Sequence, residues 1–175
     1  MRRSLWPGKT ARCGAAAVLL LLTACSGPGV NDGPLGGSGS GGGFCAPVRP
    51  GGSLAVGEAF TNGGDQAALI TGVTLWQPRH LRLLSAWALP VGSQGSVGAL
   101  TWPPPLSYVP NWDVRVPAVG AKIPARGHWQ IVLQLSPAGS PTGSAAGVTV
   151  GYDEAGTGYV MRPAYSLTLT THRCS

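Results

Sequence analysis

Residues Leu54–Trp76 read LAVGEAFTNGGDQAALITGVTLW, and this stretch decides the fold class. Apolar and polar side chains alternate on both sides of the tetrad Asn62–Asp65, and a period of two residues is typical of β-strands. Asn and Gly accept positive φ angles, so the tetrad favours a tight turn. Alternation divides the second half into two faces, with Leu69, Thr71, Val73 and Leu75 on one and Ala68, Ile70, Thr74 and Trp76 on the other. The stretch predicts a hairpin with strands at Leu54–Thr61 and Ala67–Trp76.

Further segments with strand signals follow along the chain, separated by Gly, Pro and Asn turns. They are His80–Leu89, Ala118–Ile123, His128–Leu135, Val148–Tyr152 and Tyr159–Thr171. A helix competes for the first of them, because its leucines also have helical spacing, but its shortness and its β surroundings favour a strand. Pro163 in the last segment indicates an edge position or a break there.

About seven short strands and no long helix predict an all-β domain, a two-sheet antiparallel sandwich over residues 44–175. The hairpin phrase Val56–Leu75 resembles immunoglobulin-like modules of bacterial surface proteins. The turn and strand around Ile123–Gly127 are similar to the same modules. This resemblance implies an immunoglobulin-like sandwich and names no partner. The chain departs from antibody domains, because it lacks their buried Cys–Trp–Cys pattern.

The first 24 residues have the composition of a signal peptide. A basic stretch, Arg2–Arg12, precedes the uncharged run Cys13–Ala24. That run has 12 residues, whereas a helix that spans the ~30 Å core of a bilayer needs about 20. The sequence therefore predicts that residues 1–24 are a cleaved signal peptide.

The end of this segment reads Leu22-Thr23-Ala24-Cys25 and resembles the lipobox of bacterial lipoproteins. The resemblance implies cleavage before Cys25 and a diacylglyceryl group on its sulfur. The protein would then lie outside the cytoplasm and be anchored to the cell membrane by lipid. Ordinary secretion, with cleavage after Ser26, is the alternative.

A glycine-rich stretch follows the junction. Ser26–Gly43 has 18 residues, nine of them glycine, and offers no apolar face that could be buried. Such a composition predicts a disordered tether, which together with Cys25 makes up residues 25–43. A flexible coil of this length spans roughly 21–25 Å.

Two cysteines remain once the leader is removed and Cys25 is lipidated. Cys45 opens the predicted domain and Cys174 closes it. In an oxidising compartment such a pair predicts one disulfide that joins the two ends. The alternative is a pair of metal-binding thiolates, for which His172 is the only neighbouring ligand candidate in the sequence.

The charged residues exclude some classes of function. From Cys25 onward the chain has eight Lys and Arg against six Asp and Glu, a net charge of +2. The basic residues are scattered, whereas a nucleic-acid-binding protein gathers them on one face, so no nucleic acid is predicted as a partner.

Residues for catalysis or metal binding are scarce. The three histidines, His80, His128 and His172, lack local metal-ligand spacing. The G-x-S-x-G motif of α/β-hydrolases is missing, and the adjacent Asp153 and Glu154 lie in a turn. The sequence therefore predicts a protein that is not an enzyme and has no cofactor or metal.

Residues 102–112 read WPPPLSYVPNW, with four prolines and three aromatic side chains. Such a stiff segment does not suit a central strand. It either forms a rigid cover over one end of a sheet or presents Trp102, Tyr108 and Trp112 as an exposed binding patch. The sequence leaves both possibilities open.

Three functions are compatible with these features. The first is a membrane-anchored binding or structural module that contacts another envelope protein. The second is a cell-wall carbohydrate binder that uses residues 102–112. The third, and the least supported by the residues present, is a metal carrier or a small enzyme.

Overall fold

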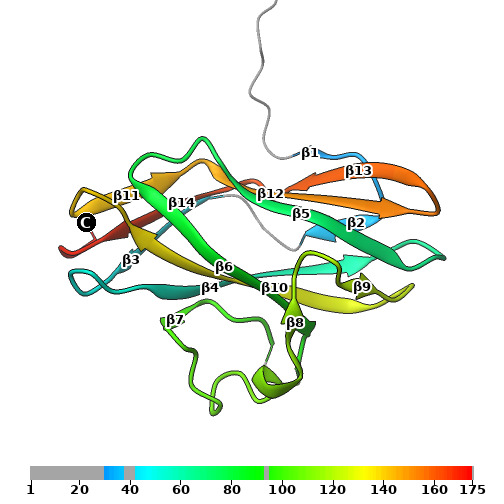
Figure 1. Ribbon diagram of the computed structural model, residues 1–175, viewed down its shortest axis with the longest axis horizontal. Helices are drawn as coiled ribbons and strands as arrows, with labels where there is room; N and C mark the ends of the chain where they lie inside the picture. The colour runs from blue at the N-terminus through cyan, green and yellow to red at the C-terminus, as the bar shows by residue number, and fades with distance from the viewer. Residues whose placement is uncertain (1–29, 38–41, 93–94, 175) are drawn as a thin grey trace, which may run out of the picture.

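The computed structural model describes residues 30–37, 42–92 and 95–174. Within these ranges the chain forms fourteen strands and one short 3-10 helix, η1 (Trp112–Val114), so the all-β prediction is confirmed (Figure 1). In chain order the strands are β1 (Val30–Asn31), β2 (Leu35–Gly37), β3 (Gly42–Pro47), β4 (Leu54–Asn62), β5 (Ala68–Trp76), β6 (Leu81–Pro90), β7 (Ala99–Thr101), β8 (Val116–Pro117), β9 (Lys122–Ile123), β10 (His128–Pro137), β11 (Thr142–Ala145), β12 (Gly147–Glu154), β13 (Thr157–Arg162) and β14 (Tyr165–Thr170). The described ranges contain no helix that is long and apolar enough to cross a membrane.

Hydrogen bonding groups these strands into three sheets. One sheet has the order β1-β13-β12-β5-β9, and a second has the order β2-β4-β10-β6-β8, with β7 also paired to β4. A small third sheet has the order β11-β14-β3. β14 and β3 are parallel, while the two larger sheets are antiparallel throughout. The sandwich therefore has two main sheets, as predicted, with a smaller sheet that the sequence did not indicate.

The main core contains side chains from all three sheets. Alternate residues of the strands point into it because successive side chains of a strand face opposite ways. Its largest fully buried members include Phe60 of β4, Ile70 of β5, Leu133 of β10, Tyr152 of β12 and Leu167 of β14.

A β-bulge corrects the predicted faces of β5. Gly151 of β12 pairs with Gly72, but the next residue, Tyr152, pairs with Ile70, so Thr71 is the extra residue. An extra residue reverses the alternation beyond it. Ala68 and Ile70 therefore point into the main core together with Val73 and Leu75, whereas Leu69, Thr71 and Thr74 are exposed. The prediction of strict alternation along β5 is wrong for this reason.

The predicted tether is also corrected by the structure. Residues 30–31, 35–37 and 42–43 lie in β1, β2 and β3, so the prediction of disorder is wrong for them. Leu35 is fully buried, and its backbone N–H donates to the Tyr152 hydroxyl at 3.1 Å. At Gly33 a Cβ would collide with the rings of Tyr152 and Tyr159, so glycine is needed for this approach. The buried Leu35 side chain and the pairing of the backbone with neighbouring strands therefore order a stretch whose composition alone favours disorder.

Both strands of the predicted hairpin are present as β4 and β5, but they do not pair, so the hairpin prediction is wrong. β4 lies in the six-stranded sheet and pairs with β10, whereas β5 lies in the five-stranded sheet and pairs with β12, so the turn after Asn62 connects the two sheets.

The remaining strand predictions are mostly confirmed. His80–Leu89 forms strand β6 rather than a helix. Tyr159–Thr171 divides into β13 and β14, with the break at Pro163, whose missing N–H cannot join a ladder. Of the predicted strand Ala118–Ile123, only Lys122 and Ile123 lie in a strand, β9.

Residues 95–117, here called the cover segment, lie over the outer face of the six-stranded sheet, at the bottom of Figure 1. Beneath them is a second, smaller core made of Ala55, Leu89, Val97, Val109, Trp112 and Val132. The backbone of the cover segment approaches β4 closely at Gly57, whose N–H donates to the Gly98 carbonyl at 3.1 Å. Any Cβ at Gly57 would collide with the Val97 carbonyl. The central strands of this sheet are therefore buried on both faces.

Candidate functional site

The predicted lipidation site lies outside the described residues. Cys25, the junction Leu22–Cys25 and the signal peptide 1–24 all precede Val30, where the description begins. Lipid attachment therefore stays a prediction from the sequence.

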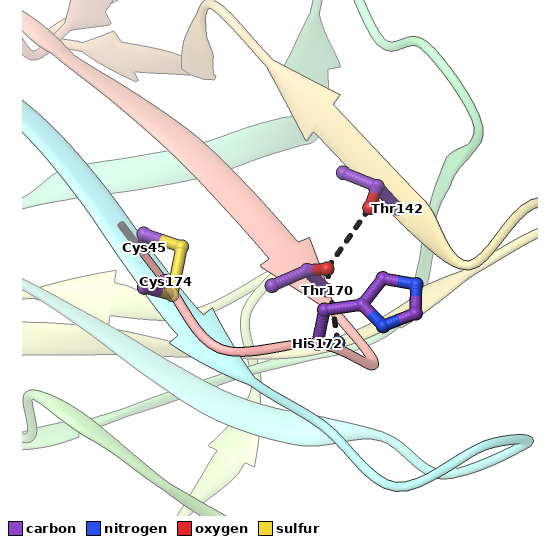
Figure 2. The surroundings of a disulfide bond; sticks show 5 residues. All are labelled: Cys45, Thr142, Thr170, His172 and Cys174. Atoms are coloured by element: carbon purple, nitrogen blue, oxygen red, sulfur yellow. Dashed lines mark hydrogen bonds between the residues drawn. A yellow bond between two sulfur atoms is a disulfide. The ribbon is translucent and has the colours of Figure 1, made fainter.

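The predicted disulfide between Cys45 and Cys174 is present, and this confirms the pairing over the alternative of two metal-binding thiolates. The Cα atoms lie 5.9 Å apart and the cysteines are separated by 129 residues in sequence. Cys45 lies on β3, which runs parallel to β14, and the chain turns back after β14 to reach it (Figure 2). That turn is held at Thr170, whose Oγ1 bonds Thr142 Oγ1 at 2.9 Å and accepts the His172 N–H at 3.2 Å. The bond thus ties β3 to the segment that follows β14, while β1 and β2 precede the loop that it closes.

The aromatic residues of the cover segment do not form one exposed patch. Trp112 is buried, with 7% of its surface exposed, whereas Tyr108 is 65% exposed and Trp102 is half-buried. Trp102 packs edge-to-face against Trp112, with ring centroids 5.5 Å apart. Of the two possibilities left open by the sequence, the structure shows the packed cover. Trp102, Tyr108 and Trp112 therefore do not present one shared exposed surface.

Arg115 holds the cover segment to the sheet through its contacts with two indole rings. Its guanidinium lies 4.9 Å from the ring centroid of Trp87 on β6 and 4.5 Å from that of Trp112. Its Nη1 also donates to the Trp112 carbonyl at 2.7 Å. Cation–π contacts of this kind stabilise by about 0.5–2 kcal/mol. Arg115 is thus a structural residue of the cover.

A chain of side-chain hydrogen bonds runs across the outer face of the six-stranded sheet. Trp87 Nε1 donates to Ser85 Oγ at 3.1 Å, and Ser85 Oγ lies 3.0 Å from Gln134 Oε1, to which it donates. Gln134 Nε2 in turn donates to Ser53 Oγ at 3.1 Å. An indole nitrogen can only donate, so Ser85 Oγ is the acceptor in the first of these bonds. The hydroxyl hydrogen of Ser53 is left at the end of this chain, free to bond elsewhere.

Ser53 opens onto a recess of about 500 Å³, here called the Trp102 recess. It lies between the turn that precedes β4 and the end of β7. Its lining includes Arg49, Ser53, Thr101 and Trp102. A flat aromatic ring, a guanidinium and hydroxyl groups therefore meet in one depression.

A second recess of about 520 Å³ lies between the loop after β5 and the strands β11 and β14. Its lining includes Arg79, Ser144 and Ser166 but no aromatic side chain. The two recesses are thus alike in size and in having one arginine, and they differ in the tryptophan.

The histidines and the paired acids of the sequence have structural surroundings. His80, His128 and His172 are exposed at strand ends, and the described residues include no group of three or more His, Cys, Asp or Glu that could hold a metal ion. Asp153 Oδ1 accepts the Gly156 N–H at 2.9 Å, and Glu154 Oε1 accepts the Gln66 N–H at 3.3 Å. Both carboxylates therefore stabilise turns.

Glu58 is a buried acid that the sequence analysis did not single out. It lies on the inward face of β4, between Val56 and Phe60, with 7% of its surface exposed. Burial raises the pKa of its carboxyl to about 7, and the neighbouring Tyr165 hydroxyl moderates the rise. Burial and the Glu58 charge raise the pKa of Tyr165 as well. The alternation Val56-Glu58-Phe60 was a signal that could have revealed it.

Arg49, Ser53 and Thr101 were also missed as site residues. The stretch Arg49–Ser53 reads as an ordinary turn, and nothing in it indicates that it lies beside Trp102. Only the pairing of β4 with β7, in which Leu54 faces Thr101, brings the two segments together.

Comparisons with known proteins assign no family. No family model and no curated protein matches the chain. Among solved structures, the ASH / PapD-like domain of human CEP192 (PapD-like domain 7) aligns with a TM-score of 0.42 and 10% identity, over 93% of this chain and 100% of that domain. The Vibrio cholerae VesB protease aligns with a TM-score of 0.34 and 16% identity, over 79% of this chain and 32% of the protease. Neither likeness assigns this chain a family, a partner or an activity.

Proposed function

We propose that this protein is an extracytoplasmic lipoprotein, anchored to the cell membrane by lipid on Cys25, that displays its β-sandwich as a non-catalytic binding module. The observation that carries the proposal is the Cys45–Cys174 disulfide, because stable disulfides are formed in oxidising compartments outside the cytoplasm. It agrees with the lipobox-like junction at Leu22–Cys25.

The placement of the first described strand supports display of the cover segment. β1 pairs with β13 at the edge of the five-stranded sheet, and in Figure 1 it lies on the opposite side of the molecule from β7 and β8. A chain that is anchored ahead of β1 would therefore carry the cover segment on the side away from its attachment. Ligands or partners outside the membrane could reach that side.

The use of the polar residues supports a non-catalytic role. Asp153 and Glu154 hold turns, and Glu58 lies inside the main core between apolar neighbours. The remaining polar network joins Trp87, Ser85, Gln134 and Ser53 and fastens strands to one another. These hydrogen bonds give Asp153, Glu154 and the four residues of the network structural roles.

Replacement of Cys25 tests the anchor. Cys25→Ala should move the protein from the membrane fraction to the soluble fraction, because the thiol that carries the lipid is gone. Cys13→Ala is the matched control: it removes another leader cysteine, one that precedes the cleavage site, and should leave the protein in the membrane. Mass spectrometry of the mature N-terminus should find diacylglyceryl-modified Cys25. Membrane retention of Cys25→Ala, or a mature chain that begins after Ser26, would contradict the proposal.

A further inference from the structure

The Trp102 recess is built by two segments that are far apart in sequence. Leu54 pairs with Thr101 across β4 and β7, so Ser53 and Trp102 are neighbours at the ends of these strands. The turn before β4 is closed by a hydrogen bond from the Gly52 N–H to the Arg49 carbonyl at 2.8 Å. Both walls of the recess are therefore fixed by backbone hydrogen bonds.

Trp102 provides a held aromatic surface. Its ring lies edge-to-face on Trp112, at an interplanar angle of 89°, and Trp112 is itself held by Arg115. Trp102 remains half-exposed and lines the recess. The negative face of an indole ring attracts weakly positive C–H groups, such as those on one side of a pyranose ring. Because the ring is already ordered, a ligand that stacks on it loses little additional conformational entropy.

Two polar groups complete the recess. The Ser53 hydroxyl accepts from Gln134 Nε2, and its own hydrogen has no acceptor elsewhere in the described chain, so it can donate to a ligand oxygen. Arg49 is exposed and has no ion-pair partner within the described ranges, where the one ion pair joins Arg126 and Asp65. A free guanidinium binds carboxylate groups through two parallel hydrogen bonds.

From this combination we propose that the Trp102 recess binds a carboxylated sugar, whose ring stacks on Trp102 and whose carboxylate pairs with Arg49. The volume of about 500 Å³ lies within the range of small-molecule sites. This inference rests on the proposed function, because only a domain displayed outside the cytoplasm would meet a cell-surface polymer. Such a polymer would be the source of the carboxylated sugar.

Isothermal titration of the purified full chain in detergent tests the site. The probes are N-acetylmuramic acid and N-acetylglucosamine, which differ by the lactyl carboxylate. N-acetylmuramic acid should bind roughly threefold to fivefold more tightly, because the pairing of an exposed guanidinium with a carboxylate is modest in water. Arg49→Gln should remove this difference while leaving the weaker binding of N-acetylglucosamine unchanged.

Matched variants separate the recess from the rest of the molecule. Arg79→Gln changes the arginine of the second recess, which lacks an aromatic ring, and should leave both affinities unchanged. Trp102→Leu should abolish binding of both sugars, whereas Trp102→Phe, which keeps an aromatic face, should retain most of it. Thermal melting of each variant shows whether it is folded.

Three results would overturn the assignment. The first is that the wild-type chain binds neither sugar. The second is that Arg49→Gln and the wild type bind N-acetylmuramic acid with equal affinity. The third is that N-acetylglucosamine 6-phosphate binds more tightly than N-acetylmuramic acid. Fractionation with Cys25→Ala is independent of these titrations. A membrane-bound chain without sugar affinity would refute the recess alone, and a sugar-binding chain that Cys25 does not anchor would refute the anchor alone.

Discussion

The two faces of the six-stranded sheet are both buried, yet they are covered in different ways. The inner face meets another sheet through aliphatic and aromatic side chains such as Leu133 and Phe60. The outer face meets the cover segment, which has little regular structure. There the buried Gln130 accepts the Val97 N–H through its side-chain oxygen at 2.8 Å. A strand partner supplies its own backbone hydrogen bonds, whereas an irregular cover needs side chains to satisfy its backbone N–H groups.

This difference explains why β10 contains two glutamines, Gln130 and Gln134, although both of its faces are buried. Gln130 and Gln134 serve the cover and the hydrogen-bond chain beneath it, and Val132 between them contributes to the smaller core. Polarity in this strand therefore marks the face that carries an irregular cover. It does not mark exposure to solvent.

The largest effect should come from truncating matched leucines in the two cores. Leu133 lies in the main core and Leu89 in the core beneath the cover, and both are fully buried. Leu133→Ala should lower the free energy of unfolding by about 3–5 kcal/mol, and Leu89→Ala by about 2–3 kcal/mol, because the cover can settle into the cavity. Urea unfolding measures both values. A loss at Leu89 equal to or larger than that at Leu133 would show that the cover is as rigid as a sheet.

A smaller effect should come from the one charged side chain on the inner face of β4. The pKa of Glu58 is raised to about 7 in the folded state, so the native protein holds this proton more tightly than the unfolded chain. Its contribution is fully present below pH 4.5 and is lost as the pH rises through 7. The free energy of unfolding should fall by about 3 kcal/mol between pH 4.5 and pH 8.

Glu58→Gln is the control for this pH dependence, since the amide keeps the shape of the side chain and cannot ionise. Other groups also titrate in this range, so the quantity that matters is the difference between the wild-type and Glu58→Gln stability curves. Parallel curves from pH 4.5 to pH 8 would mean that the pKa of Glu58 is not raised.

The smallest effect should come from the contact that fastens the cover. Arg115→Gln removes the charge that lies over Trp87 and Trp112 and should lower the free energy of unfolding by about 1 kcal/mol. Arg82→Gln, at an exposed position of β6, should change it by less than about 0.5 kcal/mol. Equal effects of the two substitutions, measured by urea unfolding, would argue against a cation–π contribution to the cover.

Much of the fold followed from local patterns. Alternation located β4, β6, β10 and β12, because each is long enough to show the period of two. The short strands β1, β2, β7 and β8 have two or three residues each and show no period. They are strands because longer partners bond to them, and no local signal reveals such a partner.

The candidate site was less predictable than the fold. The sequence singled out Trp102 because it lies in a segment rich in proline and aromatic residues. It grouped Trp102 with Tyr108 and Trp112. The actual neighbours of Trp102 in the recess, Arg49 and Ser53, come from a turn about fifty residues earlier. Proximity in sequence therefore found Trp112, on which Trp102 packs, but missed Arg49 and Ser53.

By itself, the sequence determined the all-β class, the break between two strands at Asn62–Asp65 and the pairing of Cys45 with Cys174. It did so because strand period, turn chemistry and cysteine number are local or countable properties. Only the tertiary structure decided that Trp112 is buried, that Glu58 is enclosed, and that Arg49 lies in the same recess as Trp102. These outcomes depend on which segments, distant in sequence, contact one another. The pairing of strands within the sheets determines those contacts.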